Sequence, residues 1–408
     1  MKLKKGFEFA TILRLLSSAT ISSAGESPRF RFTEFELAIS LLESAVPFNP
    51  SIPEAERRGL LSSCAFEAAK IGSFKEDSFI RAFNTAQANY LKTPPIRFVL
   101  ATNLGIIGRL DSLVRNLAST RVTVTSRPSP KFNRGEIEDL IVENMRYSTE
   151  GLATVLISLS ARNTTEAFDE GRQAVDFLRG VWNISLNQFS LNFSQGPIFR
   201  PVSKILPGPF MSVHFVNGEL AAKEIWYETN FMKPEWFYRI GKSWGKALRN
   251  ERAIRSRLTH IKYRSDIEMA LSRYARALDN VDPNLAFQGL WGLVEFLSNS
   301  EGQYDQLAKR LCFFAARKEY EIQKHIFQHL RDVRNQLTHK DVRRSSINTY
   351  LSQLDWFARN MIRFHIRSGK RFSSLPEAAA LLDCPTDVAE LKKISSRLNL
   401  AMEIQSRE

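Results

Sequence analysis

The sequence has few of the residues that mark a secreted, metal-binding or membrane-spanning protein. Its three cysteines, Cys64, Cys312 and Cys384, are odd in number and far apart, and no His or Cys accompanies them at metal-ligand spacing. No run of 18 apolar residues occurs, so no membrane-spanning helix is predicted. We therefore expect a protein of the reducing cytoplasm that holds no metal and uses no cofactor.

The first five residues, MKLKK, resemble the charged start of a signal peptide. Glu8 and Arg14 interrupt the apolar segment that would have to follow, so we predict neither export nor a membrane span. A basic amphipathic helix lying on a membrane surface stays an alternative for this segment. That alternative predicts vesicle binding that disappears when residues 1–20 are removed.

Positive charge, in contrast, is in excess. The chain carries 57 Lys and Arg against 43 Asp and Glu, for a net charge of +14. Between residues 236 and 371 there are 26 Lys and Arg against 13 Asp and Glu, so nearly all of the excess lies in the C-terminal part. Such a basic segment is expected of a domain that binds a phosphate polymer such as a nucleic acid. A merely solvated surface has the same composition.

The first half of the chain is predicted to contain helices followed by mixed strands and helices. A helical apolar pattern runs from residue 32 to about residue 104. Strands are predicted over 121–125 and 152–160, with a helix over 135–147 and another that begins after a cap at Asn163 or Thr164. Asn217-Gly218, between predicted strands at 211–216 and 219–226, predicts a hairpin with a type I′ turn.

Beyond Trp236 strand signals vanish, and an all-helical bundle of about four to six helices is predicted. Asp282 and Pro283 suit a helix N-cap and first turn. Further helices are predicted over 304–318, 320–339 and 346–367, followed by a connector at 375–383 and a closing helix at 388–404. Aromatic residues between positions 236 and 244 are expected to pack a domain junction rather than to stack on bases.

The predicted fold class is therefore α+β with several domains. A helical N-terminal region (1–110) precedes a mixed α/β domain with a β-hairpin (111–233). An all-α helical bundle (234–375) and a C-terminal helical extension (376–408) complete the chain. No internal repeat or low-complexity segment is present.

The segment RNQLTH, residues 334–339, is the most informative motif. It places a guanidinium, an amide and an imidazole within about 8 Å of helical rise. Asn335 and His339 are four residues apart and share a helix face, and Arg334 borders that face with a group suited to phosphate oxygens. These three groups are able to break a phosphodiester of RNA without a metal.

Two other segments show that the Arg–His spacing alone is weak evidence. Arg255 and His260 repeat the spacing, and Arg359-Asn360 with His365 is a looser version. Helical phase places His365 in the middle of the apolar stripe of its helix, so we predict a core histidine. Arg255 and His260 lie among charged residues with no apolar stripe, so we predict a solvated basic surface.

In the helix predicted over 320–339, the motif lies opposite the predicted core. Five apolar residues fall within about 80° of one another on a helical wheel and define the core stripe: Ile322, Ile326, Leu330, Val333 and Leu337. Asn335 and His339 lie on the opposite side. An exposed polar face, or an Asn and a His that close a helix end, would give the same pattern, so the larger context matters.

That context resembles a known family. An apolar helix with Glu295 in the segment WGLVEFL, a second helix, the Arg-Asn-x-x-x-His motif and a final apolar helix are similar to a HEPN domain of the Apea-like group. The resemblance covers about residues 283–366, and the strand at 155–158 with residues 161–182 resembles α/β segments found ahead of such domains. Some members of this family are nucleotidylated on a tyrosine that lies two residues after the motif His. Asp341 stands at that position here, which disfavours a toxin of that type.

The resemblance implies an RNA partner and a homodimer in which two copies of the motif line one cleft. In the predicted chemistry His339 takes the proton of the 2′-hydroxyl, Arg334 holds the non-bridging oxygens and Asn335 orients the ring or the phosphate. Four basic neighbours would draw the RNA backbone in without reading its sequence: Arg331, Lys340, Arg343 and Arg344. A solvated charge run is the plain alternative for these four.

The predicted function is thus a metal-independent HEPN endoribonuclease that leaves a 2′,3′-cyclic phosphate. The resemblance suggests a bacterial defence or stress effector, toxin-like, that is held inactive until a regulatory protein or a phage trigger acts. The main alternative is a non-catalytic HEPN module that binds RNA or protein and serves as a sensor or dimerisation partner. The sequence does not separate these two hypotheses.

Overall fold

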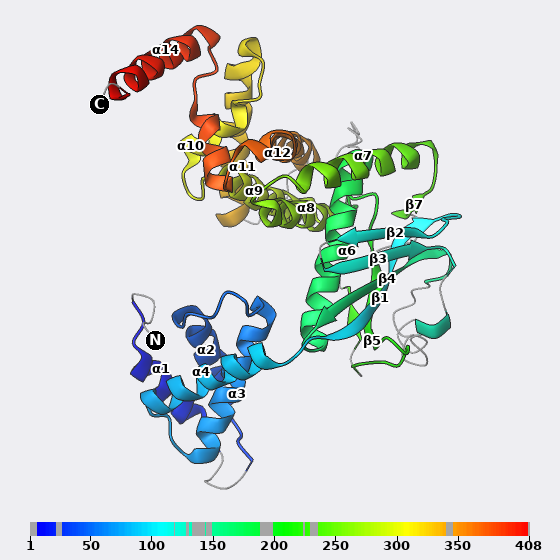
Figure 1. The fold of residues 1–408 in the computed structure, drawn as a ribbon, viewed down its shortest axis with the longest axis vertical. Coiled ribbons are helices and arrows are strands. Elements are labelled where there is room, and N and C mark those ends of the chain that lie inside the picture. The colour runs from blue at the N-terminus through cyan, green and yellow to red at the C-terminus, as the bar shows by residue number, and fades with distance from the viewer. Residues whose placement is uncertain are drawn as a thin grey trace.

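The computed structural model has a mixed α+β fold, as predicted (Figure 1). It describes residues 6–21, 27–117, 119–127, 130–132, 143, 149–187, 199–222, 225–228, 236–339 and 346–406. Of the helix predicted over 135–147, only residue 143 lies among them. Within the described ranges no helix is both long enough and apolar enough to cross a membrane.

Four N-terminal helices form a small core of their own, at the lower left of Figure 1. They are α1 (Phe9–Ala19), α2 (Phe32–Ala45), α3 (Glu54–Ile71) and α4 (Glu76–Lys92). In α1 the buried residues Phe9, Ile12, Leu13 and Leu16 recur at i, i+3, i+4 and i+7, which gives one apolar face. The helical prediction is correct as far as Lys92 and wrong beyond it.

The error lies in the central strand of the sheet, β1 (Ile96–Ile107), whose residues 98–106 are all buried. A strand covered on both faces has no apolar–polar alternation, so its sequence is easily read as a buried helix. The other strands are β2 (Leu113–Leu117), β3 (Thr120–Thr125), β4 (Leu152–Ala161), β5 (Pro207–Phe215) and β6 (Trp226–Tyr227). They form an antiparallel path in the order β2-β3-β4-β1-β5-β6, and the two-residue β7 (Tyr238–Arg239) pairs parallel with β1.

The long helix α6 (Thr164–Leu186) covers one face of this sheet. Asn163 caps it, as predicted, because its side-chain oxygen accepts a hydrogen bond of 2.8 Å from the backbone N–H of Glu166. The opposite side of α6 packs against helix α8 (Arg264–Asp279). There Gly180 is required, since a Cβ at this position would lie 2.1 Å from the carbonyl oxygen of Leu271.

The hairpin predicted around Asn217-Gly218 is present, but its turn is of another type. The N–H of Phe215 bonds the carbonyl of Glu219, and the N–H of Gly218 bonds the carbonyl of Phe215. Among these residues only Gly218 has a positive φ, of +101°, whereas a type I′ turn needs two such residues. The pattern is that of a three-residue loop, in which an ordinary turn is followed by a left-handed glycine.

The C-terminal half is helical from Lys242 on, as predicted, with short 3₁₀ turns between helices; the all-α prediction is wrong at its start, because β7 lies within residues 234–241. Its helices are α7 (Lys242–Leu258), α8 (Arg264–Asp279), α9 (Pro283–Ser298), α10 (Tyr304–Cys312), α11 (Tyr320–His339), α12 (Ile347–Ser368), α13 (Leu375–Ala380) and α14 (Val388–Gln405). Asp282 caps α9 and Pro283 fills its first position, as predicted. The helix predicted over 304–318 ends early, at Cys312.

One continuous apolar core joins the sheet, α6 and helices α7 to α13. Figure 1 shows α6 running from beside the sheet up to the group formed by α7, α8, α9 and α12. The predicted division at residues 233 and 234 therefore does not separate two apolar cores. At the other end of the chain, α14 extends away from the body and buries none of its side chains.

Candidate functional site

The helix that carries the motif, α11, packs on α9, α10 and α12. Its buried residues are Phe327, Leu330 and Val333, and the Phe327 ring stacks on Trp291 of α9 with centroids 5.4 Å apart. Ile326 and Leu337 are partly buried against the same core. The predicted stripe is wrong at its first member, because Ile322 is 62% exposed and Phe327 is the anchor near that end.

The structure brings Arg334 and Asn335 together on the last turns of α11. Both residues are half-buried, and a guanidinium nitrogen of Arg334, Nη1, donates to Oδ1 of Asn335 at 3.4 Å. This distance is long for a hydrogen bond and marks a weak contact. His339 is the last residue of α11, one turn after Asn335, and its side chain lies outside the described residues.

The four predicted RNA-backbone contacts are only partly described. Arg331 is half-buried, and its Nε lies 3.8 Å from a carboxylate oxygen of Asp332. Lys340, Arg343 and Arg344 lie outside the described residues, as does Asp341. The contribution of these cations to a binding surface stays a prediction.

The prediction that His365 is a core histidine is confirmed. Its side chain is fully buried, its Nε2 lies 2.9 Å from the Leu297 carbonyl oxygen, and its Nδ1 lies 3.1 Å from the hydroxyl of Tyr263. A carbonyl only accepts, so Nε2 carries the proton and the tyrosine donates to Nδ1. Burial lowers the pKa of His365 to about 4, which keeps the ring neutral.

The prediction for Arg255 and His260 is half correct. His260 is exposed. Arg255, however, donates to the buried carboxylate of Glu251 at 3.0 Å and to the Asn116 carbonyl oxygen at 2.8 Å. Arg115 of β2 holds the same carboxylate at 2.8 Å, so Arg255 belongs to an ion-pair network that fastens α7 to the edge of the sheet.

Of the aromatic residues after position 235, Phe237 and Trp244 pack in the interior, as predicted, whereas Trp236 and Tyr238 are half-buried. Phe237 and Trp244 are 7% and 6% exposed. The Trp244 ring meets Trp182 of α6 edge-on, with centroids 5.3 Å apart. These rings therefore hold the start of α7 against α6, and they are not available to stack on bases.

A surface feature that the sequence analysis did not single out lies on the outer side of α7. We call it the α7 basic face and define it as Lys242, Lys246, Arg249, Arg252 and Arg257, all of which are exposed. The buried side of the same helix is formed by Trp244, Ala247, Glu251 and Leu258. The spacing of 242, 246 and 249, at i, i+4 and i+7, was the sequence signal for this face.

A serine–histidine pair on β5 was also missed. The Oγ of Ser212 lies 2.8 Å from Nε2 of His214, and Nδ1 of His214 lies 3.0 Å from the Gly218 carbonyl oxygen. A nucleophile and its base adopt such a geometry. Both side chains are fully buried, however, and the ring meets Phe132 edge-on. The pair therefore stabilises the hairpin from within and is closed to a substrate.

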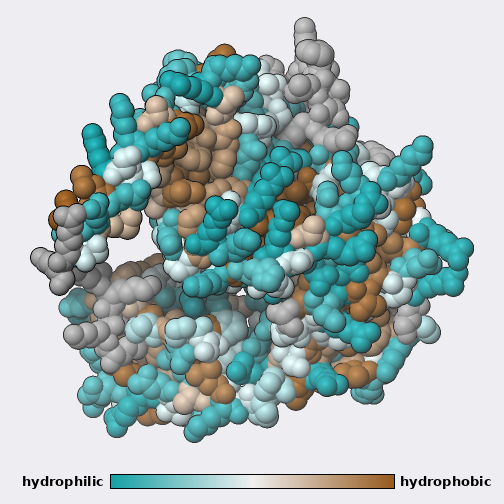
Figure 2. All heavy atoms as spheres, turned by 45° about the horizontal axis from the view of Figure 1, so that its top comes forward, coloured by the Kyte–Doolittle hydropathy of each residue, from teal (hydrophilic) through white to brown (hydrophobic). Residues whose placement is uncertain are grey.

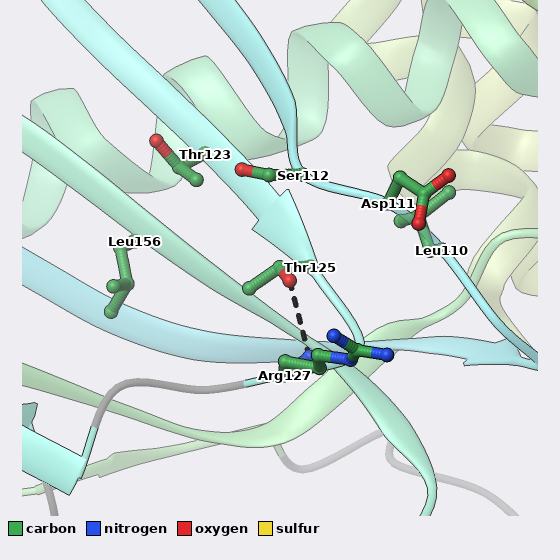
Figure 3. Close-up of a pocket in the computed structure, with 7 residues that line it drawn as sticks. All are labelled: Leu110, Asp111, Ser112, Thr123, Thr125, Arg127 and Leu156. Atoms are coloured by element: carbon green, nitrogen blue, oxygen red, sulfur yellow. Dashed lines mark hydrogen bonds between the residues drawn. The ribbon is translucent and has the colours of Figure 1, made fainter.

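A pocket of about 440 Å³ lies beside the end of β3, the middle of β4 and the segment just before β2 (Figure 3). Hydroxyl groups dominate its polar lining, and the Thr125 Oγ1 accepts a hydrogen bond of 3.1 Å from the backbone N–H of Arg127. The lining residues are Leu110, Asp111, Ser112, Thr123, Thr125, Arg127 and Leu156. No motif residue contributes to this pocket, so it is not the predicted site.

The described residues contain no group of three or more His, Cys, Asp or Glu side chains that could hold a metal ion. The chemistry available around Arg334 and Asn335 is that of a guanidinium and an amide, with the histidine one turn on. Comparison of the chain with protein-family models, with curated proteins and with solved structures gave no match.

Proposed function

We propose that this protein is a metal-independent endoribonuclease of the HEPN type that acts in the cytoplasm. The observation that supports it best is the position of Arg334 and Asn335 side by side at the end of α11, with His339 on the next turn. The order of apolar helix, second helix, motif helix and final apolar helix in α9 to α12 supports it further. The wider role proposed is that of a bacterial defence or stress effector controlled by a regulatory protein or a phage trigger.

The proposed reaction uses the nucleophile that RNA itself supplies. The 2′-oxygen attacks the adjacent phosphorus and forms a new P–O bond, while neutral His339 takes the hydroxyl proton. The bond from phosphorus to the 5′-oxygen breaks, and an acid returns a proton to the leaving oxygen. In a homodimer with both motifs in one cleft, the second His339 is that acid. The products are a 2′,3′-cyclic phosphate and a 5′-hydroxyl.

Arg334 has the electrostatic part in this proposal. Its guanidinium would hold the non-bridging oxygens, on which negative charge grows in the transition state. A single donor of this kind is often worth about 3 to 4 kcal/mol. Asn335, which makes only a weak contact with Arg334, would orient the His339 ring or the phosphate.

A second candidate is a HEPN module that binds RNA or protein without cleaving it. The half-burial of Arg334 and Asn335 favours this candidate, because it leaves less room for a phosphate than an open face would. The pocket beside β3 and β4 contains no motif residue, which also favours the non-catalytic module. Cleavage assays separate the two functions.

The test compares wild type with His339→Ala, Arg334→Ala and His260→Ala on end-labelled single-stranded RNA in EDTA. His260 is the matched control, because it is exposed and repeats the Arg–His spacing of the motif. We expect wild type and H260A to cleave equally, and H339A to be slower by about a hundredfold or more. Equal cleavage by wild type and H339A would refute the assignment. RNA binding without cleavage by any of the four proteins would establish the module instead.

A further inference from the structure

We propose that the α7 basic face is a second RNA contact of this protein, which binds the phosphate backbone independently of sequence and away from the motif. This inference rests on the proposed function for the choice of RNA as the polyanion. The face itself is defined by Lys242, Lys246, Arg249, Arg252 and Arg257, and none of these residues belongs to the motif helix.

The geometry of α7 places these cations in a row. At 100° per residue, positions 242, 246, 249 and 257 fall within about 80° of one another around the helix, and 252 lies about 60° outside this sector. Along the axis the row extends over about 22 Å, from Lys242 to Arg257. A row of this length is able to follow several consecutive phosphates of one strand.

Within the described ranges, no side chain neutralises the cations of the face. Among the described residues none of the five forms an ion pair or a side-chain hydrogen bond. The one acid within α7, Glu251, is fully buried and is held by Arg115 and Arg255. The inward position of this carboxylate leaves the outer face with positive charge alone, so its attraction for a polyanion is undiminished.

The side chains between the cations favour a nucleic acid over a lipid surface. Gly245, Ala253 and Ser256 lie on the same exposed side, and their small side chains allow a phosphate backbone to approach the helix closely. A helix that binds a membrane inserts large apolar residues on its outer side. In α7 the large apolar residues, such as Trp244 and Leu258, are buried in the core.

The location of α7 would allow one bound RNA strand to reach the motif helix, α11, as well. Helix α12 packs against both α7 and α11, so a single helix links the two. Figure 2, which turns the top of Figure 1 forward, shows hydrophilic side chains over much of this end of the molecule, with hydrophobic patches between them. RNA held along α7 would thus be kept close to the bundle during cleavage.

The test measures binding with a probe that cannot be cleaved by 2′-hydroxyl attack. The probe is a fluorescein-labelled 20-nucleotide 2′-O-methyl RNA, and its Kd is measured at several salt concentrations for wild type and for Lys242→Ala/Lys246→Ala/Arg249→Ala. Each phosphate contact on a single strand contributes about 0.7 to the slope of log K against log salt. We expect the triple variant to lower the slope by about 2 and to weaken binding at low salt at least tenfold.

The matched control is Lys392→Ala/Lys393→Ala/Arg397→Ala on α14, which removes the same residue types and the same charge from another exposed helix. We expect this control to keep the wild-type slope. An unchanged slope in the α7 variant would overturn the inference, and so would an equal loss in both variants, which would reflect net charge only. Binding of vesicles with 30% phosphatidylserine that the α7 variant alone loses, with oligonucleotide binding retained, would assign the face to membranes.

Failure of this inference and failure of the proposed function have different signatures. If the motif does not cleave RNA, wild type and H339A still bind the probe alike, and the α7 variant binds it weakly. If the α7 basic face is not an RNA contact, the α7 variant binds like wild type, whatever the cleavage assay gives.

Discussion

Arginines at the α6–α8 interface are buried and paired with carboxylates, whereas the cations on the outer face of α7 are exposed. At the interface Arg179 is 1% exposed and is held between Asp176 and Asp279, at 2.6 and 2.5 Å. Arg276 binds the second oxygen of Asp176. On α7 five cations face solvent, and among the described residues no carboxylate accompanies them. The same residue types therefore hold the fold together in one region and leave free charge in the other.

This comparison shows why net charge alone does not locate a binding surface. An arginine removed from water must be paired, because an unpaired buried charge costs several kcal/mol. Arg359 and Arg310 follow the same rule, since each donates to a carboxylate, of Asp355 and Asp383 respectively. Only the cations left over after such pairing are available to a polyanion.

The largest effect is expected from breaking the interior network. Arg179→Ala would leave Asp176 and Asp279 buried without their main partner, so the free energy of unfolding should fall by about 3 to 5 kcal/mol. Urea denaturation followed by circular dichroism measures this loss. Arg249→Ala on α7 is the control and should change stability by less than about 0.5 kcal/mol. Equal effects of the two substitutions would contradict the comparison.

A medium effect is expected from the buried histidine. The pKa of His365 is lowered to about 4, whereas the unfolded chain titrates near 6.5. The unfolded state therefore binds more protons between pH 7 and 5, and the free energy of unfolding should fall by about 2 kcal/mol over that range. His365→Gln, which keeps a donor for the Leu297 carbonyl, should flatten this part of the profile.

The exposed His260 provides the control for this measurement of stability against pH. His260→Gln removes a histidine that faces solvent, and its pH profile should retain the wild-type fall between pH 7 and 5. If H365Q and wild type lose the same stability over this range, another group titrates and the assignment to His365 is wrong.

The smallest effect is expected for the α7 basic face. Lys242→Ala/Lys246→Ala/Arg249→Ala removes three exposed, unpaired cations and shortens no buried side chain, so unfolding should change by less than about 0.5 kcal/mol. Removing like charges that repel one another should if anything stabilise the helix. A loss above 2 kcal/mol would show that these residues support the fold.

Local features of the fold could be predicted from the sequence because their causes are local. The caps at Asn163 and Asp282 follow from side chains within one turn of each boundary. The central strand β1 could not be predicted, because its burial on both faces removes the alternation that marks a strand. The turn type at Asn217-Gly218 was missed because the same dipeptide also suits a three-residue loop.

The candidate site was predictable only in part for a different reason. The proximity of Arg334 and Asn335 follows from helical geometry, and the structure shows it. The place of Phe327 in the core depends on Trp291 and Phe357 of two other helices, so phase within α11 alone chose Ile322 wrongly. The free charge of α7 likewise depends on the distant Arg115, which helps to hold Glu251 inside.

The most direct measurement of the central claim uses a DNA strand pool with randomised flanks and one ribonucleotide at a fixed position, incubated with the protein in EDTA. The account predicts a single cut on the 3′ side of the ribonucleotide, with a 2′,3′-cyclic phosphate and a 5′-hydroxyl as the new ends, which H339A does not make. Cuts at deoxyribonucleotides, or new ends with a 3′-hydroxyl and a 5′-phosphate, would contradict attack by the 2′-hydroxyl.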